Sequence, residues 1–378
     1  MKIKKLLEIG ALFFKLGLTA FGGPAAHIAM IENEVVEKRK WMERDHYLDL
    51  IGATNIIPGP NSTEIALHCG LHRAGFLGLI TAGCTFIFPA FCMTLGISWL
   101  YLKSGSIPTI DNWLFGIKPA MVVVIFFAII KLGKKACNTG PKIVIGTVVF
   151  ALSIGGQSEI IAVFCGGFFG IITQYLPLRQ KKLFSITLPV FSIIPMYFEK
   201  IVSSKLGVLF FESLKIGAIL YGSGYVLIAY VEKTFVGDLG WLTPGVLLDA
   251  VAIGQLTPGP VLTTATAIGY FIAGFWGAVL STLGIFLPSF IFVIALNPLI
   301  PKLRKSKITS GFLDGINAGV MGLLVYVTIS LATQTLTNWQ SMSVLVVALL
   351  WMWIKPFRLG IPFLVVVSSL LGWVLLCF

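Results

Sequence analysis

Long apolar segments follow one another along almost the whole chain, separated by short polar loops. Many approach the roughly 20 residues that an α-helix needs to cross a bilayer. Hydrophobic residues make up 57% of the 378 residues and charged residues only 12%, against roughly 25% charged residues in soluble domains. A soluble globule cannot bury that much apolar surface, and a disordered chain has the opposite composition. The sequence therefore predicts an all-α polytopic membrane protein.

The second half of the chain repeats the first with a shift of 200 positions, which one deletion reduces to 199. Self-similarity at a fixed distance indicates duplication of one structural unit. We therefore predict an N-terminal transporter repeat over 1–182, a joining transmembrane segment over 183–204 and a C-terminal repeat over 205–378. The matched residues include Trp41 with Trp241, Pro58-Gly59-Pro60 with Pro258-Gly259-Pro260, and Ala74-Gly75-Phe76 with Ala273-Gly274-Phe275.

Each repeat is predicted to have about six transmembrane segments, and an apolar stretch over 183–199 joins them, giving about 13 segments in all. An even number of segments plus one joining helix predicts inverted topology, with the second repeat upside down relative to the first. The sequence leaves open whether 46–70 and 246–270 cross fully or re-enter. The expected segments are 6–31, 46–70, 74–101, 113–133, 142–157 and 159–177, then 206–230, 246–270, 271–299, 312–334, 341–354 and 360–377.

The distribution of basic residues among the loops predicts the orientation. With the N-terminus in the cytoplasm, most loop Lys and Arg residues fall inside, as the positive-inside rule requires. We therefore expect a multi-pass protein of the inner (plasma) membrane, with a cytoplasmic N-terminus and the C-terminus outside. The net charge of +12 then reflects inner loops and not a nucleic-acid surface. The basic loop residues left outside are Lys38, Arg39, Lys40, Arg44, Lys103, Lys200 and Lys205.

A Pro-Gly-Pro sequence interrupts the second segment of each repeat. Two prolines two positions apart cannot continue a helix, and broken helices in inverted repeats are typical of secondary transporters that bind substrate near mid-membrane. The helix that starts after such a break offers free N–H groups to an anion; the alternative is a structural kink. The substrate-binding residues predicted here are Pro58, Gly59, Pro60, Asn61, Ser62 and Thr63, with Pro258, Gly259, Pro260, Thr263 and Thr264.

Glycine-rich breaks also interrupt the first segment of each repeat, and ionisable residues lie near both kinds of break. Intramembrane charges are functional candidates by default, although a Lys can snorkel to an interface and a buried His or acid can be structural. Glu64, His68 and His72 share a helical face, but we expect no metal and no other cofactor. Further substrate-binding candidates are Lys15, Gly22, Gly23, His27, Lys215, Gly222, Ser223, Gly224 and Gln255. The proton-coupling candidates are Asp49, Glu64 and Asp249.

Taken together, these motifs resemble the chromate ion transporter family in its long, two-domain form. The resemblance covers essentially the whole chain. It implies an inner-membrane secondary transporter with two homologous antiparallel halves, which exports chromate, a sulfate-like dianion, using the proton motive force. The residues that carry it are Phe21-Gly22-Gly23-Pro24-Ala25-Ala26-His27, Trp41, Pro58-Gly59-Pro60 and Gly254-Gln255-Leu256-Thr257-Pro258-Gly259-Pro260.

We therefore expect a transporter and not an enzyme: a secondary active exporter of chromate, driven by the membrane potential and by protons. Its partners should be chromate or a similar oxyanion, protons and the lipid bilayer, with no nucleic acid and with a homodimer as a possible assembly. The alternatives are a transporter or channel for sulfate or another small anion, and an intramembrane reductase. The reductase is disfavoured because the sequence carries no cofactor-binding motif.

Overall fold

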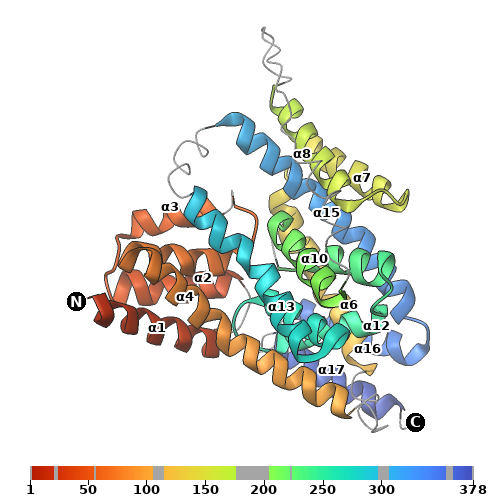
Figure 1. Ribbon diagram of the computed structural model, residues 1–378. Coiled ribbons are helices and arrows are strands. Elements are labelled where there is room, and N and C mark those ends of the chain that lie inside the picture. The colour runs from red at the N-terminus through yellow and green to blue at the C-terminus, as the bar shows by residue number, and fades with distance from the viewer. Residues whose placement is uncertain are drawn as a thin grey trace.

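The computed structural model describes residues 2–20, 24–54, 57–104, 115–175, 204–221, 224–296, 306–354 and 361–376, and within these ranges it contains helices and no strand (Figure 1). The predicted all-α class is confirmed, whereas the expected joining segment over 183–199 lies outside the described residues. The first half contains α1 (Lys2–Thr19), α2 (Pro24–Glu32), the π-helix η1 (Asn33–Lys38), α3 (Arg44–Thr54), α4 (Asn61–Ser104), α6 (Ile117–Ala136), α7 (Gly140–Ile154) and α8 (Glu159–Tyr175). The second half contains α10 (Lys205–Ile219), α11 (Val226–Val231), the π-helix η2 (Glu232–Asp238), α12 (Pro244–Leu256), the short η3 (Val261–Thr263), α13 (Thr264–Leu296), α15 (Lys307–Thr335), α16 (Trp339–Ile354) and α17 (Ile361–Leu376).

The outside of the helical assembly is apolar, as lipid requires. Large side chains such as Trp276 and Trp353 are 63% and 82% exposed, and water would penalise a surface of this kind. The chain is therefore a membrane protein. Three described helical stretches are long and apolar enough to cross a membrane: Asn61–Lys103, Val261–Ala295 and Lys307–Thr335. Shorter apolar helices accompany them at Gly140–Ile154, Glu159–Thr173, Pro244–Leu256, Trp339–Ile354 and Phe363–Leu376.

The two halves contain the same elements in the same order. In each, a first helix is followed by a glycine-rich break, a helix that ends in a π-helix, and a short helix that leads into Pro-Gly-Pro. The backbone conformation repeats as well, because Gly59 and Gly259 have φ of 144° and 97°, and Gly75 and Gly274 have φ of 68° and 63°. The duplication seen in the sequence is thus also a duplication of local structure.

The long helices α4 and α13 each contain a sharp reversal. In α4 it lies next to Gly75, whose positive φ of 68° suits glycine. The backbones of Gly70 and Gly78, on either side of the reversal, touch because neither residue carries a side chain. Helix α4 therefore consists of a short first arm, 61–73, that folds back onto a long second arm, 76–104. The aligned reversal divides α13 in the same way.

The first apolar segment, 6–31, folds back where a single crossing was predicted. Its start and its continuation through η1 meet at one edge of the structure, where Trp41 Nε1 donates a hydrogen bond to the Glu8 carboxylate at 3.1 Å. Helix α1 therefore runs inward from this edge, and α2 with η1 runs back to it. The second half closes likewise, since Lys205 Nζ lies 5.2 Å from the centre of the Trp241 ring.

The second segment, 46–70, is also a hairpin, which decides between the two readings that the sequence allowed. The rings of His46 and His72, at its two ends, lie 5.0 Å apart. Arg73 donates to the Glu8 carboxylate at 3.0 Å, so both ends lie at the same edge. The prediction of a single crossing over 6–31 is therefore wrong, and of the two alternatives for 46–70 the structure has the re-entrant one. The physical reason is that α2 runs back along α1, and that Pro-Gly-Pro separates α3 from a first arm of α4 that returns to the same edge.

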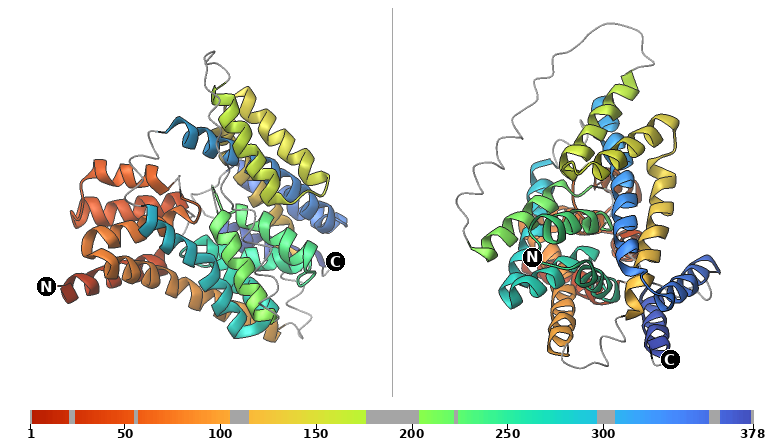
Figure 2. Two further views of the ribbon diagram at one scale, coloured as in Figure 1. Left: turned by 45° about the horizontal axis from the view of Figure 1, so that its top comes forward. Right: turned by 90° about the vertical axis from the view of Figure 1, so that its right-hand side faces the viewer.

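The paired hairpins of each half form what we call a lobe. The N-terminal lobe comprises α1, α2, η1, α3 and the first arm of α4; the C-terminal lobe comprises α10, α11, η2, α12, η3 and the first arm of α13. Between the lobes, α4 packs against α13 and α6 packs against α15. The hairpin of α7 and α8 covers α15, whereas α16 and α17 contact α6, so each half covers the other half's central helix (Figure 2).

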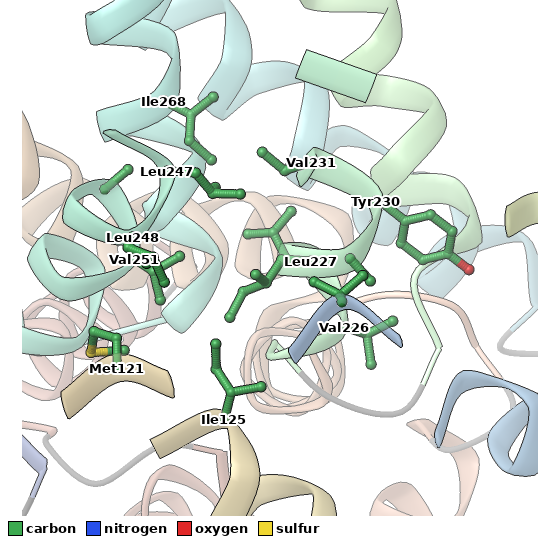
Figure 3. Packing of buried hydrophobic residues seen from close by; sticks show 14 of the residues in the cluster. Met121, Ile125, Val226, Leu227, Tyr230, Val231, Leu247, Leu248, Val251 and Ile268 are labelled. Atoms are coloured by element: carbon green, nitrogen blue, oxygen red, sulfur yellow. The ribbon is translucent and has the colours of Figure 1, made fainter. Parts of the chain in front are cut away.

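The C-terminal lobe shares one hydrophobic core with α6 and α15, and the N-terminal lobe has a core of its own. Figure 3 shows Leu248 and Val251 of α12 close to Met121 of α6 within the shared core. The N-terminal core runs from Ile9 to Phe86 and includes no described residue of α6 or α15. In Figure 1 the N-terminal lobe accordingly lies to one side of α6 and α12.

Candidate functional site

The tips of the hairpins meet inside the protein through a reciprocal pair of hydrogen bonds. The N–H of Gly59 donates to the carbonyl oxygen of Leu220 at 2.7 Å, and the N–H of Gly259 donates to that of Ala20 at 2.9 Å. Ala20 and Leu220 are aligned residues at the ends of the first helices. Each Pro-Gly-Pro thus binds the end of the other half's first helix, a contact that a two-fold relation produces. We call this place, defined by these four residues, the tip crossing.

Each Pro-Gly-Pro starts a new helix at the tip crossing. The Pro60 carbonyl oxygen accepts hydrogen bonds from the N–H groups of Thr63 and Glu64 at 2.8 and 3.1 Å, and the Pro260 carbonyl oxygen accepts one from Thr263 at 3.0 Å. Proline suits this position because its fixed φ matches a helix start. The positive ends of two helix dipoles therefore lie at the crossing, one from each half.

Polar side chains are buried beside these helix starts without hydrogen-bond partners. Thr63 and Glu64 are fully buried and Gln255 is 9% exposed. Among the described residues, the buried side-chain atoms without a partner include Thr63 Oγ1, both carboxyl oxygens of Glu64 and Nε2 of Gln255. A buried polar group without a partner is costly and rare in native proteins. A cluster of such groups is therefore expected where a ligand, a proton or water completes the bonding.

Glu64 and Ser289 lie against the same α-carbon. A Cβ atom added to Gly59 would overlap both the Glu64 carboxyl and the Ser289 hydroxyl. Ser289 is fully buried, and its hydroxyl has no partner in the structure. Sequence reasoning missed Ser289, although a signal exists: it follows Pro288, the aligned mate of Pro89, as a polar residue in an apolar run.

His27 ties the helix start of α2 to the tip crossing. Its Nε2 donates to the Ala20 carbonyl oxygen at 3.0 Å, because a carbonyl can only accept. Its Nδ1 lies 3.4 Å from the Ser62 hydroxyl, from which it accepts in that tautomer. In the second half, Thr257 ties the end of α12 to α4, since its hydroxyl forms a hydrogen bond with the Thr94 hydroxyl of α4 at 3.2 Å. These bonds hold the two tips in register.

Not every predicted residue lies at the tip crossing. Lys15 and Lys215 are exposed on the outer faces of α1 and α10. Lys215 Nζ pairs at 3.0 Å with Glu212, which lies one turn earlier in the same helix and farther from the break. Asp249 lies apart from the crossing, bound to the Tyr101 hydroxyl at 2.8 Å. The side chain of Asp49 and the predicted residues Gly22, Gly23, Gly222 and Ser223 lie outside what the structure describes.

The other predicted residues lie in or next to the crossing. Asn61 and Ser62 open α4, and Thr264 opens α13 with its hydroxyl donating to Val261 at 2.8 Å. Gly224 packs against Val261. Next to the second Pro-Gly-Pro is an open, mainly apolar groove of about 370 Å³, lined by Leu256, Thr257 and Pro258 and by Cys92, Met93, Gly96, Ile97, Trp99 and Leu100. No group of three His, Cys, Asp or Glu side chains in the described ranges is placed to hold a metal ion.

Comparison with known proteins places this architecture in a family. The family described as chromate transporter matches residues 7–171 and 207–373, the two halves in turn. The chromate transport protein of Pseudomonas aeruginosa is 30% identical over 384 residues, covering 97% of this chain and 91% of that protein. The probable chromate transport protein of Synechococcus elongatus is 27% identical over 376 residues, with 97% and 95% covered. The chromate transport protein of Cupriavidus metallidurans is 28% identical over 378 residues, covering 97% of this chain and 92% of that protein. No solved structure matches.

Proposed function

Because the chain belongs to the chromate transporter family, we propose that it is a secondary active transporter that exports chromate or a closely similar oxyanion across the plasma membrane. The observation that supports this most is the tip crossing. Two helix starts from opposite halves converge there with buried hydroxyl and amide groups that have no partner among the described residues. Such a site can bind an anion with neutral donors and helix dipoles alone.

The proposed binding set is the part of the predicted set that lies at the crossing, together with Ser289. It leaves out Lys15 and Lys215, because their side chains are exposed on the outer faces of the lobes. Neutral donors suit a transporter, since a site that bound a dianion through buried lysines would release it slowly. The proposed set is Asn61, Ser62, Thr63, His27, Gln255, Thr263, Thr264 and Ser289, around the backbone of the two Pro-Gly-Pro tips.

The hairpins support the inverted orientation proposed for the two halves. With two hairpins and four full crossings in each half, plus the joining segment, the N-terminus lies in the cytoplasm and the C-terminus outside. The 32–45 loop then moves to the cytoplasmic side, next to the N-terminus. The outer basic loop residues fall from seven to four, which agrees better with the positive-inside rule; they are Lys103, Lys200, Lys205 and Lys233.

Export is the direction that the membrane potential favours. Moving one charge through 100 mV is worth roughly 2.3 kcal/mol, so a dianion leaving a negative interior gains roughly 4.6 kcal/mol, about three decades of gradient. Proton coupling would add to this. Glu64 is the strongest candidate, because an ionised carboxylate beside the site would repel the anion and a protonated one would not. Asp49 and Asp249 remain the other candidates.

Flux measurements in proteoliposomes test the proposal. Labelled chromate and labelled sulfate are supplied separately, with voltage set by a potassium gradient and valinomycin and with the pH gradient imposed independently. We expect saturable chromate flux that follows the voltage. Saturable flux of sulfate but not of chromate would favour the sulfate alternative, and non-saturating flux would favour a channel. No flux of either anion above protein-free liposomes would contradict the proposal.

A further inference from the structure

Aligned residues of the two lobes lie in different surroundings. Leu48 of α3 is 51% exposed, whereas Leu248, at the same place in α12, is fully buried. Helix α12 packs against α6, α17 and α4, whereas α3 packs chiefly against α4. Two lobes of the same local structure are therefore docked differently. The C-terminal lobe is docked on α6, whereas among the described residues the N-terminal lobe makes no comparable contact with α15, the helix that corresponds to α6, and we call it undocked.

A charged cluster fastens the docked lobe. The Asp249 carboxylate, with its side chain 1% exposed, lies 3.5 Å from Lys118 Nζ and accepts a hydrogen bond from Tyr101 at 2.8 Å. Lys118 Nζ also lies over Gly245, one turn before Asp249, at 3.1 Å from where a Cβ atom would stand. The cluster therefore ties α12 to the first turn of α6 and to the end of α4.

The sequence does not provide the same cluster for the other lobe. Lys118 aligns with Asn317 of α15, and Tyr101 aligns with Ile300. Helix α3 carries Asp45 and Asp49 at the places of Gly245 and Asp249. Docking α3 on α15 would therefore bring acidic residues toward a neutral amide where α12 meets a cation.

We propose that Lys118 is a latch that holds the C-terminal lobe docked, and that transport alternates between docking of the C-terminal lobe on α6 and docking of the N-terminal lobe on α15. This rests on the proposed function, because it takes the docked and undocked lobes as the two ends of a transport cycle. Because the C-terminal lobe has this latch and the N-terminal lobe lacks it, the protein without a bound anion rests in the state seen here. In the proposed orientation, the undocked lobe then faces the cytoplasm, where an exporter collects its anion.

The chemistry of Asp249 explains why the latch depends on a cation. A buried carboxylate needs a positive partner, and removing that partner leaves an uncompensated buried charge. Lys118, with its side chain 33% exposed, reaches Asp249 only while α12 is docked on α6. Losing the Lys118 charge should therefore shift the equilibrium toward undocking of the C-terminal lobe by a typical coupling factor of about tenfold.

The aligned leucines supply a matched pair of reporters. In a full-length chain whose six native cysteines are replaced, Leu48→Cys and Leu248→Cys are made separately. Each is reacted with a membrane-impermeant maleimide without any anion, Leu48→Cys in inverted vesicles and Leu248→Cys in right-side-out vesicles, so that the reagent is on the side from which each lobe enters. We expect Leu48→Cys to react about tenfold faster than Leu248→Cys. Equal rates, or an unreactive Leu48→Cys that lies in lipid, would overturn the proposal.

Exchanging Lys118 and Asn317 tests whether the Lys118 charge causes the difference in docking between the two lobes. Lys118→Asn should raise the Leu248→Cys rate about tenfold, and adding Asn317→Lys should reverse the order of the two reporters. Lys118→Arg keeps the charge and should leave the order unchanged. If Lys118→Asn does not fold, Asn317→Lys alone should still slow the Leu48→Cys reaction. Reaction rates that stay the same in all these variants would overturn the latch. This outcome does not depend on which anion the protein transports, because the reactions are run without any anion.

Discussion

A single methyl group at Gly59 tests the packing of the tip crossing. The φ of Gly59, 144°, strains any residue with a side chain, and a Cβ atom there would overlap the Glu64 carboxyl and the Ser289 hydroxyl. Gly75 is the matched control, since its φ is also positive, at 68°, but a Cβ atom there would meet nothing within 4 Å. Gly59→Ala therefore adds strain and overlap, whereas Gly75→Ala adds strain alone.

The two contributions can be separated by magnitude. Positive φ costs a residue with a side chain roughly 1–2 kcal/mol, and extra carbon in a packed interior costs roughly 1–3 kcal/mol more. We expect Gly75→Ala to lower the free energy of unfolding by about 1–2 kcal/mol and to leave chromate flux near that of the wild type. Gly59→Ala should lower it by about 2–5 kcal/mol and reduce flux at least about tenfold. Unfolding in detergent measures the change in stability, and flux in proteoliposomes measures transport. Equal effects of the two variants on flux would show that close packing at Gly59 does not matter for transport.

Three further substitutions test individual roles. Glu64→Gln should leave voltage-driven chromate flux intact but abolish its response to a pH gradient. For one coupled proton, that response is a change in chromate accumulation of about tenfold per pH unit. A preserved response would exclude Glu64 as the coupling group. Ser289→Ala removes a hydroxyl that has no partner in the structure, so it should raise KM for chromate several-fold while the melting temperature stays unchanged. Lys15→Ala combined with Lys215→Ala should leave the KM within about twofold, because both side chains are exposed away from the crossing; a large rise in KM would return them to the binding set.

The sequence predicts where helices break more securely than where the chain goes next. Pro58-Gly59-Pro60 must end α3 whatever follows, because proline lacks the N–H that a helix needs. Whether the chain then continues or turns back is decided by contacts far apart in the sequence. At the edge of the N-terminal lobe these join Glu8 to Trp41 and Arg73. Rules that consider only neighbouring residues in the sequence contain no information about such long-range pairs.

The same distinction separates the site residues that were predicted from those that were missed. Thr63, Glu64 and Gln255 lie next to the duplicated motif, so the repeat itself points to them. Ser289 aligns with Ala90 and comes to the crossing only because α13 packs against α4. Lys15 was predicted to act inside the membrane because it interrupts an apolar segment. The structure turns it to the exposed face of α1 instead, a choice made by packing and not by composition.

In the proposed architecture, re-entrant hairpins enter from opposite sides and meet at their tips in mid-membrane. Lys40 and Gly240 occupy aligned turns, with positive φ of 50° and 61°, at the outer ends of the two lobes. Single cysteines at these positions, in the cysteine-replaced chain in intact cells and in inverted vesicles, can be labelled with an impermeant maleimide. We expect Lys40→Cys to react only from the cytoplasm and Gly240→Cys only from outside. Labelling of Lys40→Cys from outside would mean that the 6–31 segment crosses the membrane, and labelling of both from one side would mean that the halves are not inverted; either result contradicts the claim.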